Sequence, residues 1–200
     1  MANIWDERYA ADDYYYGTKP NEFLLSQQHR LRAGMECLAV ADGEGRNGVW
    51  LAEQGLNVVS IDGSIRAQEK AKQLAQQRAV NLDFQHVDLM NWAWPENKFD
   101  VVVGIFIQVF AGEMRSQLFE NIKRSLKPNG LLLLQGYTTR QLEYKTGGPS
   151  QIENLYTEEI LKAAFSDMEM LHFAEHDQII NEGSGHHGMS ALIDLVAKKK

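Results

Sequence analysis

The sequence has a single cysteine, Cys37, among its 200 residues. One cysteine excludes an internal disulfide and is typical of a protein that works in a reducing compartment. Cys37 lies within an apolar run, so we expect a small, buried hydrophobic side chain. Nothing in the neighbouring sequence would lower the pKa of its thiol, which argues against a nucleophile.

Long hydrophobic segments are also absent from the sequence. The longest apolar stretch, VVVGIFIQVF at 101–110, is too short to span a bilayer and contains Gln108. The N-terminus reads MANIWDERYAADD, which is polar and acidic and lacks the apolar core of a secretory signal peptide. We therefore predict a cytoplasmic protein that has no membrane partner.

Positive charge is in deficit, because 20 Lys and Arg face 27 Asp and Glu, for a formal net charge of −7. Binding to a nucleic-acid backbone needs a basic face, so we expect no nucleic-acid partner. The three lysines at 198–200 are expected to form a solvated tail. A length of 200 residues and a hydrophobic content of 44% favour one ordinary globular domain.

From about residue 35 the sequence alternates regularly between strand-like and helix-like segments. Five apolar runs are predicted as strands, at 35–41, 57–62, 82–88, 99–110 and 131–137. The segments between them are rich in helix formers, with Ser64 as a candidate N-cap. Strands that alternate with helices predict βαβ units and a parallel sheet.

The C-terminal part breaks this alternation. A predicted helix at 157–165 is followed by two strand-like runs, EMLHFAEHDQII and MSALIDLVAKK, which the glycine-rich segment NEGSGHHG joins. Two neighbouring strands with a short connection predict an antiparallel pair. The predicted fold class is therefore α/β: a Rossmann-like, seven-stranded, mostly parallel sheet with an antiparallel C-terminal hairpin. The segment 138–150 is the one long irregular insertion, and such loops often carry function.

The stretch VADGEGRNGVW, residues 40–50, matches the G-x-G-x-x-G fingerprint of dinucleotide-binding proteins at 43–48. Ligands of open α/β sheets bind beyond the carboxyl ends of the strands. Gly43 and Gly45 would allow a ligand close to the backbone, and the helix that follows offers free N–H groups. After the next strand, Asp62 can accept both hydroxyls of a ribose. These features serve an NAD-dependent oxidoreductase and other nucleotide-cofactor enzymes equally well.

Hydride transfer also needs a proton donor, commonly a tyrosine with a lysine. The one Tyr-x-x-x-Lys pattern runs from Tyr15 to Lys19, ahead of the glycine loop. Gly17 and Pro20 disfavour a helix there, so the match is interpreted as accidental. An NAD-dependent oxidoreductase remains an alternative that rests on the glycine fingerprint alone.

The segments VADGEGRNG, VVSIDGS, FQHVDLMNW, FDVVVGIF and SLKPNGLLLLQGY resemble, in this order, the class I S-adenosylmethionine-dependent methyltransferases. The opening WDERYAADDYYYGTKPNEFL further resembles a small bacterial subgroup near the tellurite-resistance and thiopurine methyltransferases, in which an aromatic N-terminal segment closes over the cofactor. The resemblance implies S-adenosyl-L-methionine as cofactor and a small-molecule methyl acceptor. A non-catalytic module that binds S-adenosylmethionine is a further alternative.

By this resemblance the glycine loop holds the methionine part of the cofactor, Asp62 the ribose, and Asp88 with the backbone of Leu89 the adenine. The candidate cofactor residues are Ala41, Asp42, Gly43, Gly45, Arg46, Asp62, Gly63, Asp88, Leu89 and Ile105. Ala39 stands where the family usually has an acidic residue, and Asp42 or Glu44 is a candidate replacement. One domain over 1–200 is expected, with an N-terminal arm at 1–30, a cofactor-binding core at 31–137 and the acceptor side at 138–200.

Four residues are candidates for the acceptor side: Tyr16, Tyr137, Arg140 and His186. Aromatic faces attract a sulfonium, which favours Tyr16. Arg140 is the first candidate for steering an anionic acceptor, and Arg46 is the second. Methyl transfer is an in-line displacement in which positioning carries most of the acceleration, and a base is needed only for an acceptor that must lose a proton. A soft anionic sulfur or metalloid centre is the expected acceptor, and the protein is expected to be a monomer or homodimer.

A short motif at 172–176, HFAEH, matches the H-x-x-E-H zinc pattern. That pattern requires a helix, whereas this segment is predicted as a strand. We therefore expect no metal site.

Overall fold

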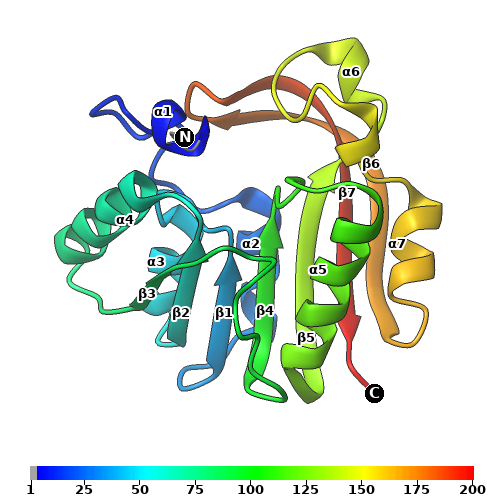
Figure 1. Ribbon diagram of the computed structural model, residues 1–200, viewed down its shortest axis with the longest axis horizontal. Helices are drawn as coiled ribbons and strands as arrows, with labels where there is room; N and C mark the ends of the chain where they lie inside the picture. Colours follow the sequence, from blue (N-terminus) through cyan, green and yellow to red (C-terminus); the bar gives the residue numbers. More distant parts are fainter. Residues whose placement is uncertain (1–3) are drawn as a thin grey trace.

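A seven-stranded sheet with the strand order β3-β2-β1-β4-β5-β7-β6 forms the centre of the protein in the computed structural model, which describes residues 4–200 (Figure 1). The strands are β1 (Glu36–Val40), β2 (Asn57–Asp62), β3 (Asp83–His86), β4 (Phe99–Ile105), β5 (Leu126–Tyr137), β6 (Glu169–Glu182) and β7 (His186–Lys198). Strands β1 to β5 pair in parallel, and β7 is antiparallel to both β5 and β6. The predicted fold class is confirmed.

Helices cover both faces of the sheet (Figure 1). The helices are α1 (Ile4–Arg8), α2 (Glu22–Ser26), α3 (Arg46–Glu53), α4 (Ile65–Gln77), α5 (Gly112–Ser125), α6 (Gln141–Tyr144) and α7 (Glu158–Ala164). Two short 3-10 turns lie at Gln28–Arg30 and Ile152–Asn154. Ser64 caps α4 as predicted, because its side chain accepts a hydrogen bond from the N–H of Ala67 at 3.1 Å.

Alternate side chains of the central strands enter two separate hydrophobic cores. Leu38 and Val40 of β1 pack in one core with α5 and α7, whereas Cys37 and Ala39 pack in the other with α2 and α3. This alternation is the pattern of strands that are covered on both faces. Cys37 is fully buried, as predicted, and burial raises the pKa of its thiol well above the ordinary value.

The predicted strand 99–110 was too long at its carboxyl end. β4 ends at Ile105, because the next residue, Phe106, has a φ of +56° and leaves the extended conformation. The predicted third strand, 82–88, is shorter in the structure, where β3 runs from Asp83 to His86 and the turn begins at Leu89. Both turns bring side chains to the carboxyl edge of the sheet.

The β6–β7 hairpin extends past the rest of the sheet and curves over its carboxyl edge toward α1 (Figure 1). At its tip, the N–H of Gly185 donates a hydrogen bond to the carbonyl of Tyr15 at 3.1 Å. The N-terminal segment also contacts α4, where the Tyr14 hydroxyl donates to the carbonyl of Lys70 at 3.0 Å. Distant parts of the chain therefore meet above this edge. Of the predicted arm 1–30, residues 1–3 lie outside the described residues.

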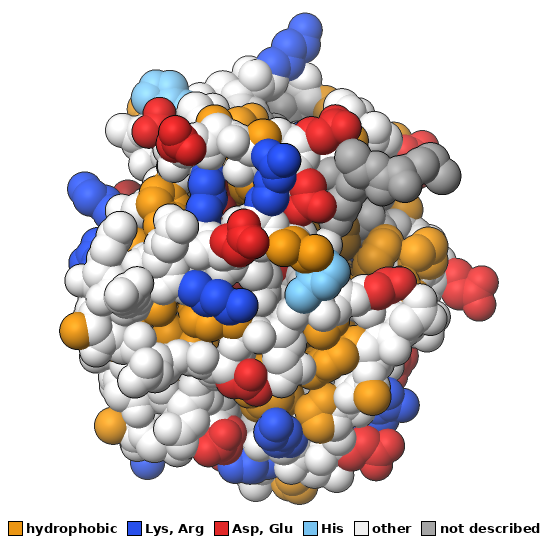
Figure 2. All heavy atoms as spheres, turned by 60° about the vertical axis from the view of Figure 1, so that its left-hand side comes forward, with side chains coloured by type: hydrophobic (Ala, Val, Ile, Leu, Met, Phe, Trp, Pro, Cys, Tyr) orange, Lys and Arg blue, Asp and Glu red, His pale blue; other side chains and the backbone are white. Residues whose placement is uncertain are grey.

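Lys, Arg, Asp and Glu side chains are intermixed on the face shown in Figure 2. Within residues 4–200, no helix has the length and apolar character needed to cross a membrane. No group of three or more His, Cys, Asp or Glu in the same range could hold a metal ion, and the HFAEH segment lies in strand β6, as predicted.

Candidate functional site

The loop between β1 and α3 turns sharply at the carboxyl edge of the sheet. Ala41, Gly43 and Gly45 all have positive φ angles, of 47°, 59° and 85°. Left-handed backbone is easy for glycine and strained for alanine, so Ala41 stores backbone strain at the start of the loop. The resulting turn brings the N-terminus of α3 to the edge of the sheet.

The two glycines of this loop face different neighbours. A Cβ on Gly43 would lie 3.0 Å from the Tyr9 hydroxyl, on the side of the N-terminal segment. A Cβ on Gly45 would lie 2.6 Å from the Cβ of Ala71 in α4. The missing side chain of Gly45 therefore makes room for a helix, and the expectation that it makes room for a ligand is corrected. Gly43 is the glycine that faces the edge of the sheet.

Asp62 lies at the end of β2 beneath the glycine loop, with only 7% of its surface exposed. Its carboxylate accepts hydrogen bonds from the N–H groups of Gly43 and Ser64, both at 2.8 Å. Burial raises the pKa of this carboxyl group, and the two N–H groups act against that rise. A carboxylate has about four acceptor positions, so Asp62 can still accept the hydroxyls of a ribose.

The Asp42 carboxylate is directed into the protein. It accepts hydrogen bonds from the N–H of Gly48 at 3.0 Å and from the Ser60 hydroxyl at 2.9 Å, and burial raises its pKa to about 7. Glu44 is the other candidate to replace the acidic residue that the family usually has at position 39. It forms an ion pair with Lys70 at 2.7 Å. Both acidic side chains therefore have partners within the protein. The Asp42 carboxylate points toward Gly48 and Ser60, away from the side on which a cofactor contact was expected.

The predicted adenine residues lie at the same edge, one strand further along. Asp88 is exposed and accepts hydrogen bonds from the N–H of Met90 at 3.0 Å and from Asn91 Nδ2 at 2.7 Å, which lower its pKa. Leu89 is buried, and its carbonyl accepts a bond from Trp94 Nε1 at 2.9 Å. Gly63 directly follows Asp62, and Ile105 is the last residue of β4.

The residue types at this edge are those that S-adenosylmethionine needs. Gly43 leaves its backbone open on the side where the Tyr9 hydroxyl lies, and its N–H donates to the Asp62 carboxylate beneath it. The exposed carboxylate of Asp88 follows the neighbouring strand. Glycine loop, ribose acceptor and adenine-side carboxylate thus share one edge, which is where open α/β sheets bind nucleotide-like ligands.

A second cluster, which we call the aromatic cluster, consists of Tyr16, Phe106, Tyr137 and His186. The ring centre of His186 lies 4.4 Å from that of Tyr16, 4.5 Å from that of Phe106 and 5.4 Å from that of Tyr137. The four rings come from the N-terminal segment, the residue after β4, the end of β5 and the start of β7. Three of the four predicted acceptor-side residues are thereby brought together.

Glu182 lies beside the aromatic cluster and is buried, and the predicted site did not include it. Its Oε2 accepts from Arg46 Nη2 at 2.8 Å and lies 3.4 Å from His186 Nδ1, while its Oε1 accepts from Asn21 Nδ2 at 2.9 Å. Burial alone would raise the pKa of Glu182, but His186 and Arg46 lower it to about 2. The sequence does contain a signal for this pair, because Glu182 and His186 stand on either side of the glycine-rich hairpin turn.

One donor near this cluster has no partner and a second has only a poor one. Arg46 Nη1 is buried and makes no hydrogen bond with any residue from 4 to 200. The Tyr137 hydroxyl is also buried and makes no hydrogen bond of good geometry, although the Ser190 side chain is close enough to act on it. Burial, with the charge of Glu182, raises the pKa of Tyr137, while Ser190 acts in the opposite direction, so the hydroxyl keeps its proton. An unsatisfied buried donor costs about 1–3 kcal/mol, and such groups in native structures usually mark a missing partner.

Arg140, the fourth predicted acceptor-side residue, does not join the aromatic cluster. It is exposed and forms an ion pair with Asp177 of β6 and a hydrogen bond to the Tyr144 hydroxyl at 3.1 Å. The expectation that Arg140 steers an acceptor is therefore corrected, because its charge is paired on the surface.

The insertion 138–150 contributes backbone to the site. A Cβ on Gly147 would lie 3.2 Å from Cδ2 of His186, and one on Gly148 would lie 2.7 Å from the Tyr137 ring. These two glycines allow the loop to lie directly against the aromatic cluster. Whether this loop is functional stays a prediction, and Gly147 and Gly148 are the residues that place it beside the candidate site.

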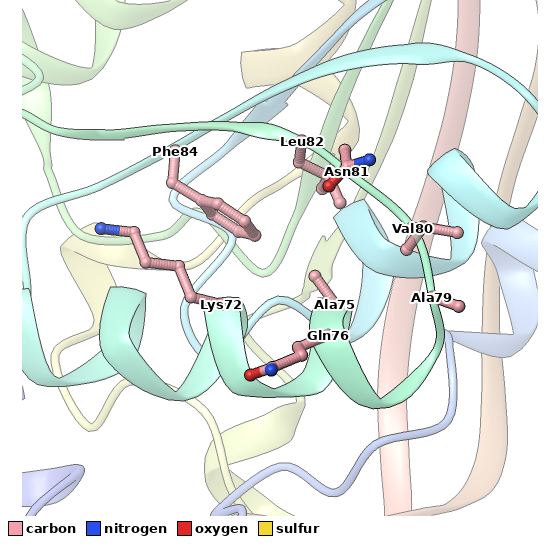
Figure 3. Close-up of a pocket in the computed structure, with 8 residues that line it drawn as sticks. All are labelled: Lys72, Ala75, Gln76, Ala79, Val80, Asn81, Leu82 and Phe84. Carbon is pink, nitrogen blue, oxygen red and sulfur yellow. The ribbon is translucent and has the colours of Figure 1, made fainter.

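Two surface cavities lie apart from the aromatic cluster. One of about 560 Å³ lies between α4 and β3, where Lys72, Gln76 and Phe84 line it (Figure 3). The other, of about 390 Å³, lies between the segment after Gly17 and α3, with Arg46, Trp50 and Arg78 in its lining, so it reaches the arginine that also binds Glu182. Neither is lined by Asp62 or His186.

Residues 37–130 match the family model described as "Methyltransferase domain". The chain is also 31% identical over 130 residues to the ribosomal protein L11 methyltransferase of Dictyoglomus turgidum, covering 64% of this chain and 42% of that protein. The chain spans about a third to two fifths of the length of the curated relatives that it matches.

Solved structures share the fold over nearly the whole chain. TehB from Haemophilus influenzae superposes with a TM-score of 0.74 and 17% identity, covering 98% of this chain and 66% of that one. A structure concerned with the conversion of a disulfide bond into a thioacetal group during echinomycin biosynthesis gives a TM-score of 0.78 and 16% identity, covering 98% and 91%. At these identities the likeness establishes the fold.

Proposed function

This chain belongs to the class I S-adenosylmethionine-dependent methyltransferases, and from that premise we propose that it transfers a methyl group from S-adenosylmethionine to a small-molecule acceptor. The G-x-G-x-x-G match at 43–48 lies inside the methyltransferase domain, so it does not by itself imply NAD. The cofactor supplies a methyl group on a positively charged sulfur that departs as a neutral thioether.

On the cofactor side, the loop at Gly43 would hold the methionine part and Asp62 the ribose hydroxyls. Asp88 and the backbone of Leu89 would hold the adenine. The support for these roles is their common position at the carboxyl edge of β1, β2 and β3. The work of these residues is to fix the cofactor, since positioning carries most of the acceleration in such a displacement.

On the acceptor side, we propose a soft anionic sulfur or metalloid centre. The observation that carries this is the buried Arg46 Nη1, which has no hydrogen-bond partner among residues 4–200 and whose guanidinium is joined to His186 of the aromatic cluster through Glu182. A guanidinium without a second partner favours an anion. The surrounding rings favour a polarisable atom such as sulfur. The thioacetal chemistry of the structural neighbour from echinomycin biosynthesis also concerns sulfur.

A small acceptor is favoured over a macromolecule, although the name of the Dictyoglomus relative refers to a ribosomal protein. His186 is 5% exposed and Tyr137 fully buried, so the hairpin and the loop at Gly147 would have to move further for a bulky substrate than for a small one to reach the aromatic cluster.

Calorimetric titration with S-adenosylmethionine, S-adenosylhomocysteine and NADH tests the cofactor. We expect both adenosyl-sulfur compounds to bind and NADH not to bind. Asp62→Ala should weaken binding by about 1.5–3 kcal/mol, because a charge-assisted pair to the ribose is lost. Asp83→Ala, at an exposed carboxylate of β3, is the control. Binding of NADH alone would refute the proposal, and cofactor binding without turnover of any thiol, selenite or tellurite would leave a non-catalytic module.

A further inference from the structure

We propose that His186, oriented by Glu182, is the general base that takes a proton from the methyl acceptor. The acceptor then arrives as a neutral acid such as a thiol and becomes the soft sulfur anion of the proposed function only after this proton is removed. This inference rests on the proposed methyl transfer and narrows its substrate class. A permanently charged oxyanion needs no base, whereas a thiol must lose a proton before or during transfer.

The hairpin itself sets the geometry of the pair. Glu182 ends β6, His186 begins β7, and the two residues are directly opposed in the antiparallel register. Oε2 of Glu182 lies 3.4 Å from Nδ1 of His186, at the long end of the hydrogen-bonding range. Because the carboxylate faces Nδ1, that nitrogen carries the hydrogen and Nε2 keeps its lone pair.

Glu182 is fixed by more than the histidine. Arg46 and Asn21 donate to its two oxygens at 2.8 Å and 2.9 Å. Asn21 is itself held, because its Nδ2 also donates to Gln135 Oε1 at 2.7 Å. The carboxylate therefore stays ionised and in place, which is the arrangement that orients a histidine base.

The other edge of the His186 ring is left without a protein partner. Nε2 makes no hydrogen bond with the residues that the structure describes. Cδ2, the carbon next to Nε2, faces Gly147, where a Cβ would lie at 3.2 Å. Glycine at 147 therefore keeps a side chain away from this edge. An acceptor that meets Nε2 would lie among the rings of Tyr16, Phe106 and Tyr137.

The groups that act on His186 come from every side. Glu182 of β6 favours the imidazolium, whereas Arg46 of α3 and Arg8 of α1 disfavour it. The hydroxyls of Tyr16 and Tyr137 are neutral near pH 7, since burial raises the pKa of both. Burial, the largest influence, lowers the pKa of His186, so the ring is neutral and able to accept a proton, and Glu182 stabilises the charge that forms.

In the proposed step, the bond from hydrogen to the acceptor heteroatom breaks and the proton moves to His186 Nε2. The electron pair stays on the heteroatom, which uses it to form the new bond to the methyl carbon. The bond from that carbon to the sulfonium sulfur breaks at the same time, and its electron pair returns to the sulfur, so that a neutral thioether leaves. His186 afterwards releases the proton to water. No oxidant or reductant enters the balance.

The tautomer of His186 is testable without cofactor or acceptor. We propose nitrogen NMR of histidine-labelled protein, with His186→Gln to identify the resonances. We expect Nδ1 to be protonated and Nε2 unprotonated at neutral pH, and Glu182→Gln to lose this preference. Glu182→Asp should keep it, because the charge remains. His187→Gln is the matched control, since His187 is exposed and contacts Asn181 Oδ1 at 3.1 Å. A hydrogen on Nε2, or an imidazolium at pH 7, would overturn the proposal.

Turnover of two different thiols tests whether His186 acts as a base. Thiophenol is largely ionised at neutral pH and needs no base, whereas benzyl mercaptan is largely neutral and must lose its proton. We expect His186→Gln to lower kcat with benzyl mercaptan by at least about 100-fold and with thiophenol by less than about 3-fold. His187→Gln should change neither. Equal losses on both thiols would overturn the base role, and turnover of neither by the wild type would overturn the acceptor class. Failure of S-adenosylmethionine to bind in calorimetry would instead refute the proposed function and leave the NMR result standing.

Discussion

The Tyr9 hydroxyl lies 3.0 Å from the point where a side chain on Gly43 would place its Cβ. Tyr9 is buried there, above Asp62, and Asp6 of the same segment accepts a hydrogen bond from the Ser64 hydroxyl. The N-terminal segment thus contacts the glycine loop and the end of β2 together. Any ligand that uses both must share this space with Tyr9, so ligand affinity and the position of the segment are linked.

The difference between the two loop glycines gives a matched pair of variants. Gly43→Ala and Gly45→Ala introduce the same side chain on left-handed backbone, so the backbone strain is similar. Only Gly45→Ala also overlaps Ala71 of α4. We expect it to lower the free energy of unfolding by about 1–3 kcal/mol more than Gly43→Ala. Gly43→Ala should instead weaken S-adenosylmethionine binding. Urea unfolding and calorimetry measure the two effects, and equal stabilities would contradict the assignment.

Asp42 predicts a pH dependence of stability. Its pKa is raised by burial from the ordinary 3.8 to about 7, so between these values the folded protein holds a proton that the unfolded chain has released. The stability contributed by this group is therefore full below about pH 4 and falls as the pH rises to 7. Asp42→Asn should remove a slope worth about 2–4 kcal/mol across that range.

Urea unfolding at several pH values above 5 measures this slope. That range avoids Glu182, whose pKa of about 2 lies below its ordinary 4.5 and whose contribution is lost only as the pH falls between those values. Asp83→Asn, at an exposed carboxylate, should keep the wild-type slope. A slope in Asp42→Asn as steep as in the wild type would show that the carboxylate is ionised in the folded protein.

Asn21 combines a helix cap with a bridge between two buried side chains. Its Oδ1 accepts from the N–H of Leu24 at 3.0 Å, and its Nδ2 donates to both Gln135 and Glu182. Thr157 caps α7 in the same way but has no such bridge. We expect Asn21→Ala to cost about 2–4 kcal/mol of unfolding free energy and Thr157→Ala about 1 kcal/mol. If the two losses are equal in chemical denaturation, the bridge contributes nothing.

Arg46 is buried and Arg140 is exposed, so variants of the two compare a buried positive charge with a surface one. Arg46→Gln should raise the KM for a thiol acceptor by about 10- to 100-fold, because a charge-assisted hydrogen bond is lost. Arg140→Gln should change it by less than about 2-fold, since the guanidinium is already paired with Asp177. Steady-state kinetics with both substrates varied distinguishes the roles. A larger effect of Arg46→Gln on the affinity for S-adenosylmethionine would contradict the acceptor-side role and agree with the prediction from the sequence that Arg46 binds the cofactor.

The fold was predictable because it depends on local pattern, and one topological rule grouped part of the candidate site. Apolar runs identify the strands, and the rule that ligands bind at carboxyl ends groups Tyr137 with Asp62 before any coordinates exist. His186 became a candidate from the glycine-rich turn of the C-terminal hairpin. The details that escaped prediction depend on pairs far apart in the chain. Arg140 is neutralised by Asp177, 37 residues later, and Glu182 is held by Arg46, 136 residues earlier.

Backbone direction was a second limit on prediction. The positive φ of Phe106 ends β4 early and places the Phe106 ring 4.6 Å from that of Tyr137. Phenylalanine rarely adopts left-handed backbone, so the sequence gives no sign of this turn. Similarly, the sequence shows that Asp42 precedes the glycines but not that its carboxylate faces Ser60 and the interior. Both outcomes are decided by packing around the loop.

The position of β7 has a consequence for biosynthesis. β7 follows every other strand in the chain, yet it lies between β5 and β6 and pairs with both. While the ribosome is still making residues 186–198, β5 presents an unpaired edge, which is prone to association with other chains. The parallel strands can pair during translation, but the sheet and the aromatic cluster close only when this segment has emerged. The complete sheet and the aromatic cluster can therefore form only after residues 186–198 have left the exit tunnel.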